Sequence, residues 1–390
     1  MGIVLRTIVR LGLVGLLIGA SARVCPAGDM AFSSPASTNL FTGSGQPGDK
    51  FDIVIVAEGY TQAQMPLFAT NAQAVTNAIL AMEPYRTYRK FLRVWRVDSI
   101  SRQSGIDHPG NLVFRNTCFN SFYLDAPGDA PGQGRFIAVP DLVNLALAGS
   151  RVSGGDLTLV ICNDPQYGGS GLPGLAAVYN GAEMTRVATH ESGHAHAGLG
   201  DEYFYSDLGY FGPEPTQPNL TTQPTALACK WAPWVGATVA DGGRVGTFAG
   251  GLNVFDRGIF RPVDSDCHMK DHDRGYCPVC REAVIRSLHG RTNMITRTSA
   301  SANVGLNFGT FTASVDEIVP DASTVVTWTV DGVAVGTTST LANGTAMRHT
   351  LTRNLGWGAH TVTAKVRDNS TMLRIGSDPK SSVTWTFWQN

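Results

Sequence analysis

The chain has 390 residues, which is enough for two or three domains that each have a hydrophobic core. Hydrophobic residues make up 43% of the sequence and charged residues 16%, a composition typical of a folded globular protein rather than a disordered one. The formal net charge of −1 argues against nucleic acid or an anionic membrane as a partner, because both attract a basic surface.

The N-terminus has the pattern of an export signal. Arg6 and Arg10 precede the apolar residues 11–19, and small residues follow at 20–22. This order is typical of a cleaved signal peptide, which we place at residues 1–27. An uncleaved membrane anchor is the less favoured alternative, because a spanning helix needs about 20 apolar residues. We expect a secreted protein, extracellular or periplasmic, without a transmembrane segment after the signal peptide.

The predicted export to an oxidising compartment decides how the cysteines are interpreted. If cleavage follows Ala27, six of the seven cysteines remain, an even number that favours disulfides in an exported protein. The pairing cannot be deduced from the sequence. An alternative is a structural zinc ion held by the thiolates of the last four of these cysteines. The disulfide candidates are Cys118, Cys162, Cys229, Cys267, Cys277 and Cys280.

Strands and helices alternate in the first half of the chain. This alternation predicts a largely parallel α/β sheet. A glycine-rich run at 168–171 leads into residues 175–179, which suggest an edge strand. The expected elements are strands at 51–57, 91–97 and 157–162, and helices from Thr61 to about Glu83 and from Pro140 to about Ala148.

The second half begins with a helix at 182–197. Residues 198–275 are rich in Gly, Pro, Trp and Asp, so we expect an irregular segment that is functional or cross-linked. A further helix is expected at 278–289, closed by Gly290.

After about residue 299 the hydrophobic pattern changes to alternation with a period of two, seen at 325–330, 362–366 and 383–387. Asp331-Gly332 supplies a hairpin turn. These features predict an all-β sandwich of immunoglobulin-like type. We therefore expect two domains after the signal peptide, at 28–298 and 299–390. The second has no visible catalytic cluster, and stabilising the protein or binding substrate are equally plausible roles for it.

The residues with clear chemical potential lie in the helix at 182–197. His190 and His194 are four residues apart, so they project from one helix face within reach of one ion. Neutral imidazoles are good zinc ligands, and the adjacent Glu191 can act as general base toward a water that attacks a peptide carbonyl. This pattern predicts hydrolysis assisted by one catalytic zinc ion. The alternative is an exposed polar helix face.

A catalytic zinc ion also needs a third protein ligand and an open position. In metzincins the pattern is His-Glu-x-x-His-x-x-Gly-x-x-His/Asp. Here Gly198 and Asp201 keep the final interval, but one extra residue separates His194 from Gly198. We favour Asp201 as third ligand. Glu202 is the first alternative, and Glu282 is the second, if a later helix supplies the ligand.

Other residues are candidates for supporting roles. Met269 follows Cys267-His268 where a metzincin has the methionine beneath its metal, although simple packing also explains it. Tyr203 and Tyr276 are candidates to donate to the oxyanion of the transition state. His196 is expected off the ligand face, on the surface or behind the ligands. The sequence neither supports nor excludes a calcium ion bound by four aspartates: Asp264, Asp266, Asp271 and Asp273.

Several motifs together resemble the IgA-peptidase family of bacterial secreted zinc metallopeptidases. The strongest is Thr189-His190-Glu191-Ser192-Gly193-His194 followed by residues 197–203, Ala-Gly-Leu-Gly-Asp-Glu-Tyr. The resemblance covers roughly residues 50 to 290. It implies a metzincin-like α/β domain with zinc and endopeptidase activity, Asp201 as third ligand and Met269 beneath the site. Cleavage of immunoglobulin A is not implied. The further matching segments are 51–60, 104–109, 229–231, 258–262, 267–269 and 277–282.

The leading hypothesis is a secreted zinc endopeptidase that acts on protein or peptide substrates. One alternative is a noncatalytic surface or glycan-binding protein with a structural metal, which the presence of Glu191 disfavours. Another is a zinc amidase that acts on peptidoglycan. The sequence indicates neither the side-chain preference nor the oligomeric state.

Overall fold

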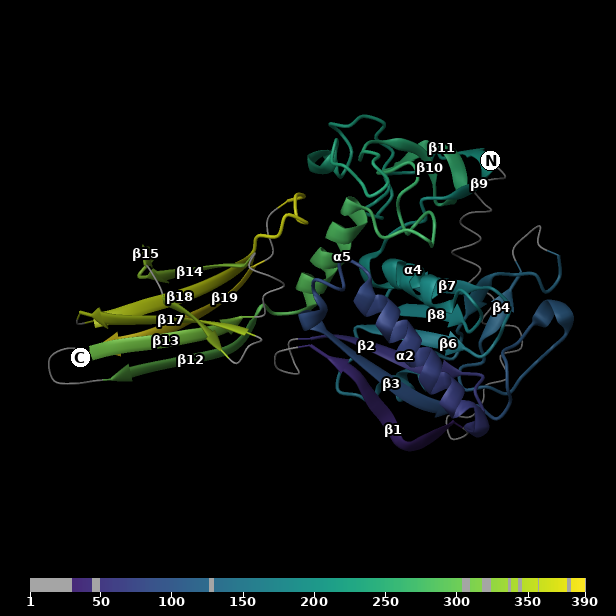
Figure 1. Cartoon of the computed structure of the whole chain (residues 1–390), viewed down its shortest axis with the longest axis horizontal. Helices are drawn as coiled ribbons and strands as arrows, with labels where there is room; N and C mark the ends of the chain where they lie inside the picture. The colour runs from purple at the N-terminus through teal and green to yellow at the C-terminus, as the bar shows by residue number, and fades with distance from the viewer. Residues whose placement is uncertain are drawn as a thin grey trace. The chain divides into compact units, whose positions relative to one another are not determined.

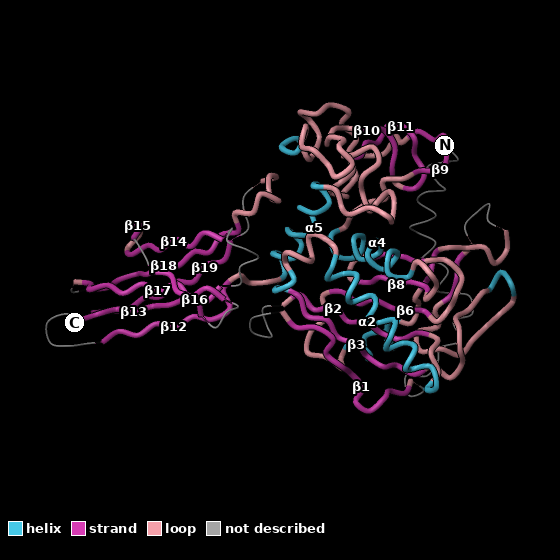
Figure 2. The backbone as a smooth tube through the Cα atoms, in the orientation of Figure 1, coloured by secondary structure: helices cyan, strands magenta, loops and turns pink. Residues whose placement is uncertain are grey.

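The computed structural model describes residues 30–43, 50–125, 130–303, 309–317, 324–335, 338–342, 346–356, 358–376 and 380–389. The expected signal peptide at 1–27 lies outside the described residues. Within the described ranges, none of the helices combines the length and apolar character needed to cross a membrane. The fold is mixed α/β, with more strands than helices (Figures 1 and 2).

The largest sheet has eight strands. Their order is β1-β3-β2-β6-β8-β7-β5-β4. Every residue of β2 is buried, as expected for a strand whose faces are both covered. The strands are β1 (Ala31–Thr42), β2 (Phe51–Glu58), β3 (Leu92–Ile100), β4 (Phe122–Leu124), β5 (Phe136–Ala138), β6 (Leu157–Cys162), β7 (Gly169–Leu172) and β8 (Leu175–Tyr179).

The sheet is less parallel than the sequence predicted. β6 pairs with β8 and β5 with β7 in parallel, whereas β7–β8 and β4–β5 are antiparallel. The edge position expected for residues 175–179 is wrong, because β8 lies between β6 and β7. The glycine-rich run itself forms β7 and turns back through Gly174, whose φ of +78° suits glycine.

Four α-helices lie close to their predicted positions. Local hydrogen bonds mark two of the starts: the Thr61 N–H donates to Gln64 Oε1 at 3.0 Å in the 3₁₀ turn Gln62–Gln64 that leads into α2, and the Asn144 N–H donates to Asp141 Oδ1 at 2.9 Å at the start of α3. The sequence therefore predicted these helices from capping and periodicity. They are α2 (Met65–Ala81), α3 (Leu142–Gly149), α4 (Met184–Ala197) and α5 (Pro278–Arg291).

The segment between α4 and α5 consists mostly of loops, as predicted (Figure 2). It also contains a three-stranded sheet of order β10-β11-β9 that the sequence did not reveal. Leu220, Phe255 and Ile259 form a small buried core in this region. The strands are β9 (Phe204–Gly209), β10 (Phe248–Gly251) and β11 (Asn253–Arg261).

The C-terminal part forms two antiparallel four-stranded sheets, of order β12-β13-β17-β16 and β15-β14-β18-β19. Asp331 and Gly332 have φ values of +47° and +81°, so the predicted hairpin turn is confirmed. The immunoglobulin-like type stays a prediction. The strands are β12 (Ile295–Asn303), β13 (Gly309–Glu317), β14 (Thr324–Val330), β15 (Val333–Val335), β16 (Thr338–Ala342), β17 (Ala346–Leu355), β18 (Gly358–Asp368) and β19 (Lys380–Gln389).

The chain folds into two compact units. The first contains the described residues within 1–39, 54–75 and 95–191, and the second contains the described residues within 40–53, 76–94 and 192–390. The division passes within β2, β3 and α4, which are continuous elements. The domain boundaries expected from the sequence, at 28–298 and 299–390, remain predictions.

Candidate metal centre and its surroundings

Helix α4 ends in a turn that orients one of its histidines. Gly198 has a φ of +63°, and its N–H donates to the His194 carbonyl at 3.0 Å, which is a left-handed helix cap. The cap brings the Leu199 carbonyl to 2.6 Å from His194 Nδ1. Because a carbonyl oxygen only accepts, Nδ1 carries the proton and the lone pair of the ring is at Nε2.

The structure brings the three predicted metal ligands together. One ligand atom from each of His190, His194 and Asp201 lies within 4.8 Å of the other two. His194 Nε2 is 3.2 Å from Asp201 Oδ1. With its Nδ1 proton directed at Leu199, the neutral His194 ring presents the Nε2 lone pair toward the Asp201 carboxylate, as a histidine ligand of a shared metal ion would. Two imidazoles and one carboxylate form a donor set that suits zinc.

The extra residue before Gly198 does not prevent Asp201 from reaching the histidines. The glycine cap reverses the chain after α4, and the Asp201 carbonyl accepts a hydrogen bond from the Leu252 N–H at 2.8 Å. Leu252 has a φ of +55° and lies at the junction of β10 and β11. The unpredicted three-stranded sheet therefore helps to hold the ligand turn.

Glu191, the predicted general base, lies against β7. A Cβ atom added to Gly169 would be 2.7 Å from Glu191 Oε1 and 2.7 Å from Val187 Cγ1. Only glycine fits there without displacing the carboxylate or the helix. The hairpin of β7 and β8 thus approaches the helix at the position of the base.

Met269 and Tyr276 pack against the ligand helix. A Cβ atom added to Gly193 would be 3.0 Å from Met269 Sδ and 2.7 Å from Tyr276 Oη. Both side chains are buried, and the Tyr276 ring makes an edge contact with His268 at 5.2 Å. Met269 therefore packs on the helix between the two histidines. Its role beneath a metal stays a prediction.

Tyr203 has a different setting. It is half-buried, and its ring lies 5.2 Å from that of Tyr205 on β9. The contribution of Tyr203 or Tyr276 to stabilising a transition state stays a prediction.

The two alternative third ligands face other partners. Glu202 is fully buried and groups with Cys267, Cys277 and Cys280 rather than with the histidines. Burial raises the pKa of Glu202 to about 8, so its carboxyl group holds a proton more tightly than usual.

Glu282 is also engaged elsewhere. Its Oε2 accepts from Trp234 Nε1 at 2.5 Å and from the Arg374 N–H at 2.9 Å, and its Oε1 accepts from Arg286 Nε at 2.8 Å. These bonds occupy both carboxylate oxygens of Glu282. Glu282 thus connects the first part of α5 to Trp234 and to the backbone at Arg374.

The six predicted disulfide cysteines are free thiols in the structure, and all are buried. The four-thiolate alternative also differs from the structure: Cys229 donates to the Ala226 carbonyl at 3.3 Å, and Glu202 takes the fourth place beside the other three. Sequence reasoning missed this partner because Glu202 is 65 residues from Cys267, and no local pattern links them.

His196 lies inside the protein rather than on its surface. Its Nδ1 is 3.0 Å from the Tyr85 hydroxyl, and its ring centroid is 4.2 Å from that of Phe51. Burial, with a smaller effect of Arg291, lowers the pKa of His196 to about 3. It is therefore a neutral residue that packs in the interior against Phe51 and Tyr85. The expectation of a surface position was wrong, and the alternative of a place behind the ligands stays a prediction.

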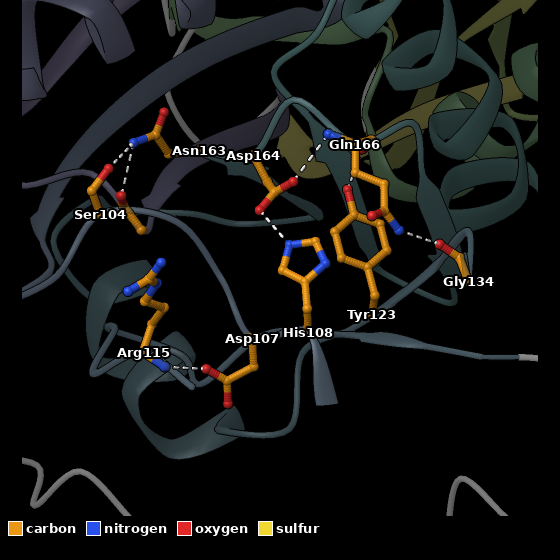
Figure 3. Close-up of polar contacts among 10 residues, drawn as sticks. Ser104, Asp107, His108, Arg115, Tyr123, Gly134, Asn163, Asp164 and Gln166 are labelled. Atoms are coloured by element: carbon orange, nitrogen blue, oxygen red, sulfur yellow. Dashed lines mark hydrogen bonds and ion pairs between the residues drawn. The ribbon is translucent and has the colours of Figure 1, made fainter. Parts of the chain in front are cut away.

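A second polar network involves the segment 104–109, which belongs to the family-like motifs (Figure 3). His108 Nε2 is 2.7 Å from Asp164 Oδ2, and the His108 ring stacks on Tyr123 with centroids 4.8 Å apart. Asp164 follows the carboxyl end of β6, and its Oδ1 accepts from the Gln166 N–H at 3.0 Å. These contacts hold the 104–109 motif at the carboxyl end of β6, which explains why His108 occurs in this motif.

One comparison with known proteins gives a family for this chain. A family model described as IgA Peptidase M64 matches residues 40–241, which include α4 and the ligand turn. No curated protein matches the chain. The family expected from the motifs is therefore confirmed.

Proposed function

The chain belongs to the IgA Peptidase M64 family, and on this premise we propose that it is a secreted zinc-dependent endopeptidase. The observation that carries the proposal is the convergence of His190, His194 and Asp201 within 4.8 Å. The orientation of His194 by the Leu199 carbonyl supports it, because metal-binding histidines usually donate their second ring N–H to such a group.

We assign the following roles in hydrolysis to residues of the chain. Zinc, when bound, supplies Lewis-acid chemistry that polarises a peptide carbonyl and makes water more acidic. Glu191 takes a proton from the attacking water and returns it to the departing amine. Gly169 leaves space for the Glu191 carboxylate, because a Cβ atom there would be 2.7 Å from Glu191 Oε1. Tyr276 or Tyr203 would donate to the developing oxyanion.

The role of Glu191 is tested by the substitution Glu191→Ala in the purified mature protein. We expect bound zinc to be unchanged and the rate of peptide hydrolysis to fall by about 10²-fold or more, the usual contribution of a general base. Zinc is measured by elemental analysis and hydrolysis with casein and a quenched peptide library. The matched control is Glu183→Ala, an exposed carboxylate just before the same helix, which should leave both values unchanged.

A Glu191→Ala variant that cleaves at the wild-type rate would remove Glu191 from the mechanism. The same preparations, incubated with purified peptidoglycan, separate the endopeptidase from an amidase. Glycan binding that persists without any hydrolysis in the wild type would favour the noncatalytic alternative. Export is tested by N-terminal sequencing of the released protein, which should begin near residue 28.

A further inference from the structure

Three cysteines and one glutamate meet beside the ligand turn. Glu202 follows Asp201 directly, Cys267 precedes Met269 by two residues, and Cys277 and Cys280 are at the start of α5. All four side chains are buried, and their ligand atoms lie within 4.8 Å of one another. None of them belongs to the set formed by His190, His194 and Asp201.

The spacing of these atoms suits a shared metal ion. Glu202 Oε1 is 3.3 Å from Cys267 Sγ and 3.2 Å from Cys280 Sγ, and the two sulfur atoms are 3.6 Å apart. A tetrahedral zinc ion with Zn–S bonds of about 2.3 Å and Zn–O bonds of about 2.0–2.2 Å holds its ligand atoms about 3.5–3.8 Å apart. The group is therefore within a few tenths of an ångström of the size that zinc requires.

One polar atom in the cluster has no protein partner. Glu202 Oε1 accepts from Asn219 Nδ2 at 3.0 Å, but Glu202 Oε2 is buried and lacks a hydrogen-bond partner among the described residues. A buried carboxylate oxygen without a partner is costly, and a cation bound at the same carboxylate group would offset part of that cost.

A disulfide explains this arrangement less well than a metal. One S–S bond joins two sulfur atoms, which would leave the third thiol and the Glu202 carboxyl group buried together. A metal uses all four groups, and thiolate ligands favour zinc among the common divalent ions. The net charge of such a centre would be −2, and both Arg261 and Lys270 interact electrostatically with Glu202.

We propose that the protein binds a second, structural zinc ion through four side chains: Glu202, Cys267, Cys277 and Cys280. This ion joins the turn after α4 to two segments that lie 65 or more residues later in the sequence, namely the Met269 segment and the start of α5. It braces Asp201 and Met269 from behind, and it takes no part in hydrolysis. The proposal does not rest on the proposed function, because its ligands are separate from those of the first ion.

The test is the zinc content of the mature full-length protein and of three variants. We expect two zinc ions per chain in the wild type and one in Cys280→Ser. Cys229→Ser removes a buried thiol outside the cluster and should keep both ions. His194→Ala removes a ligand of the first site and should keep one. In that variant X-ray absorption should show zinc–sulfur distances of about 2.3 Å.

The absorption spectrum of His194→Ala keeps the test decisive if Cys280→Ser does not fold. A thiol count in denaturant without reductant adds an independent readout, and six reactive thiols are expected in the mature chain. A zinc spectrum without sulfur ligands, or four thiols and one disulfide among Cys267, Cys277 and Cys280, would overturn the proposal. If His194→Ala loses hydrolysis but keeps its zinc–sulfur signal, the result supports a catalytic and a structural zinc site as two separate sites.

Discussion

Glycines at two positions set the distances around the ligand helix. Gly169 leaves room for the Glu191 carboxylate, and Gly193 leaves room for Met269 and Tyr276. Neither glycine has a positive φ, so the reason for glycine is the close approach of side chains and not the backbone conformation. The sequence did not show this, because His-Glu-x-x-His leaves the residue at Gly193 unspecified.

Replacing Gly193 with alanine should therefore damage the site. The new Cβ atom would lie 2.7 Å from Tyr276 Oη, so the tyrosine or the helix must move. We expect Gly193→Ala to destabilise the protein by about 1–3 kcal/mol, the usual cost of overpacking, and to lower hydrolysis. Urea unfolding and a peptide assay measure the two effects.

The matched control is Gly290→Ala on α5. A Cβ atom there would meet nothing within 4 Å, so the gain in helix propensity should leave stability equal or raised by up to about 1 kcal/mol. Equal stability of the two variants would contradict the steric account of Gly193.

The buried Glu58 gives a prediction about pH. Its carboxylate accepts from Thr117 Oγ1 at 2.7 Å and from the Phe119 and Ser121 N–H groups at 3.0 and 2.8 Å. Burial, which outweighs these bonds, raises the pKa of Glu58 above its usual 4.5. The folded state thus holds this proton more tightly than the unfolded state, and the contribution of Glu58 to stability falls as pH rises above about 4.5.

The measurement compares the wild type with Glu58→Gln by urea unfolding across this pH range. Glutamine cannot accept all three bonds, so the variant should be less stable by about 1–3 kcal/mol at low pH. The difference in unfolding free energy between the two proteins should shrink as pH rises. A difference that grows with pH would show that the hydrogen bonds outweigh burial.

At the scale of elements, the sequence predicted what local patterns determine. Capping and periodicity located α2, α3, α4 and α5, and the spacing of His190 and His194 located the first two ligands. The sequence did not predict β1 or β7. The polar segment that forms β1 and the glycine-rich run that forms β7 became strands only through pairing with distant neighbours. The same holds for Glu202 and its cysteines, whose proximity is a product of tertiary folding.

Asn219 illustrates how a distant residue holds a ligand turn. It is fully buried, its Oδ1 accepts from the Gly200 N–H at 2.8 Å, and its Nδ2 donates to the Gly200 carbonyl at 2.8 Å. Asn219→Asp keeps the acceptor but removes the donor and adds a second carboxylate beside Glu202. We expect a loss of about 1–3 kcal/mol in stability and weaker hydrolysis.

The control for this substitution is Asn293→Asp. Asn293 is exposed, and its Oδ1 accepts from the Ile295 N–H at 2.9 Å, a bond that an aspartate preserves. Unfolding curves that coincide for the two variants would show that Asn219 does not hold the turn.

At the scale of the whole molecule, metal binding should couple to folding. The two proposed zinc ions share the segment from His194 to Glu202, and the second also joins the Met269 segment and α5. Removing both ions with a chelator should lower the melting temperature more than His194→Ala does, because structural zinc sites stabilise the folded state directly. Calorimetry measures this, and an unchanged melting temperature after complete zinc removal would contradict the coupling.

His190, His194 and Asp201 are the proposed ligands of the catalytic zinc ion. The most direct measurement is an anomalous difference map recorded at the zinc absorption edge from crystals of active protein. We predict a peak about 2.0–2.2 Å from a ring nitrogen of each histidine and from an Asp201 carboxylate oxygen. A map without a peak at this position, or with a carboxylate other than Asp201 as third ligand, would contradict the account.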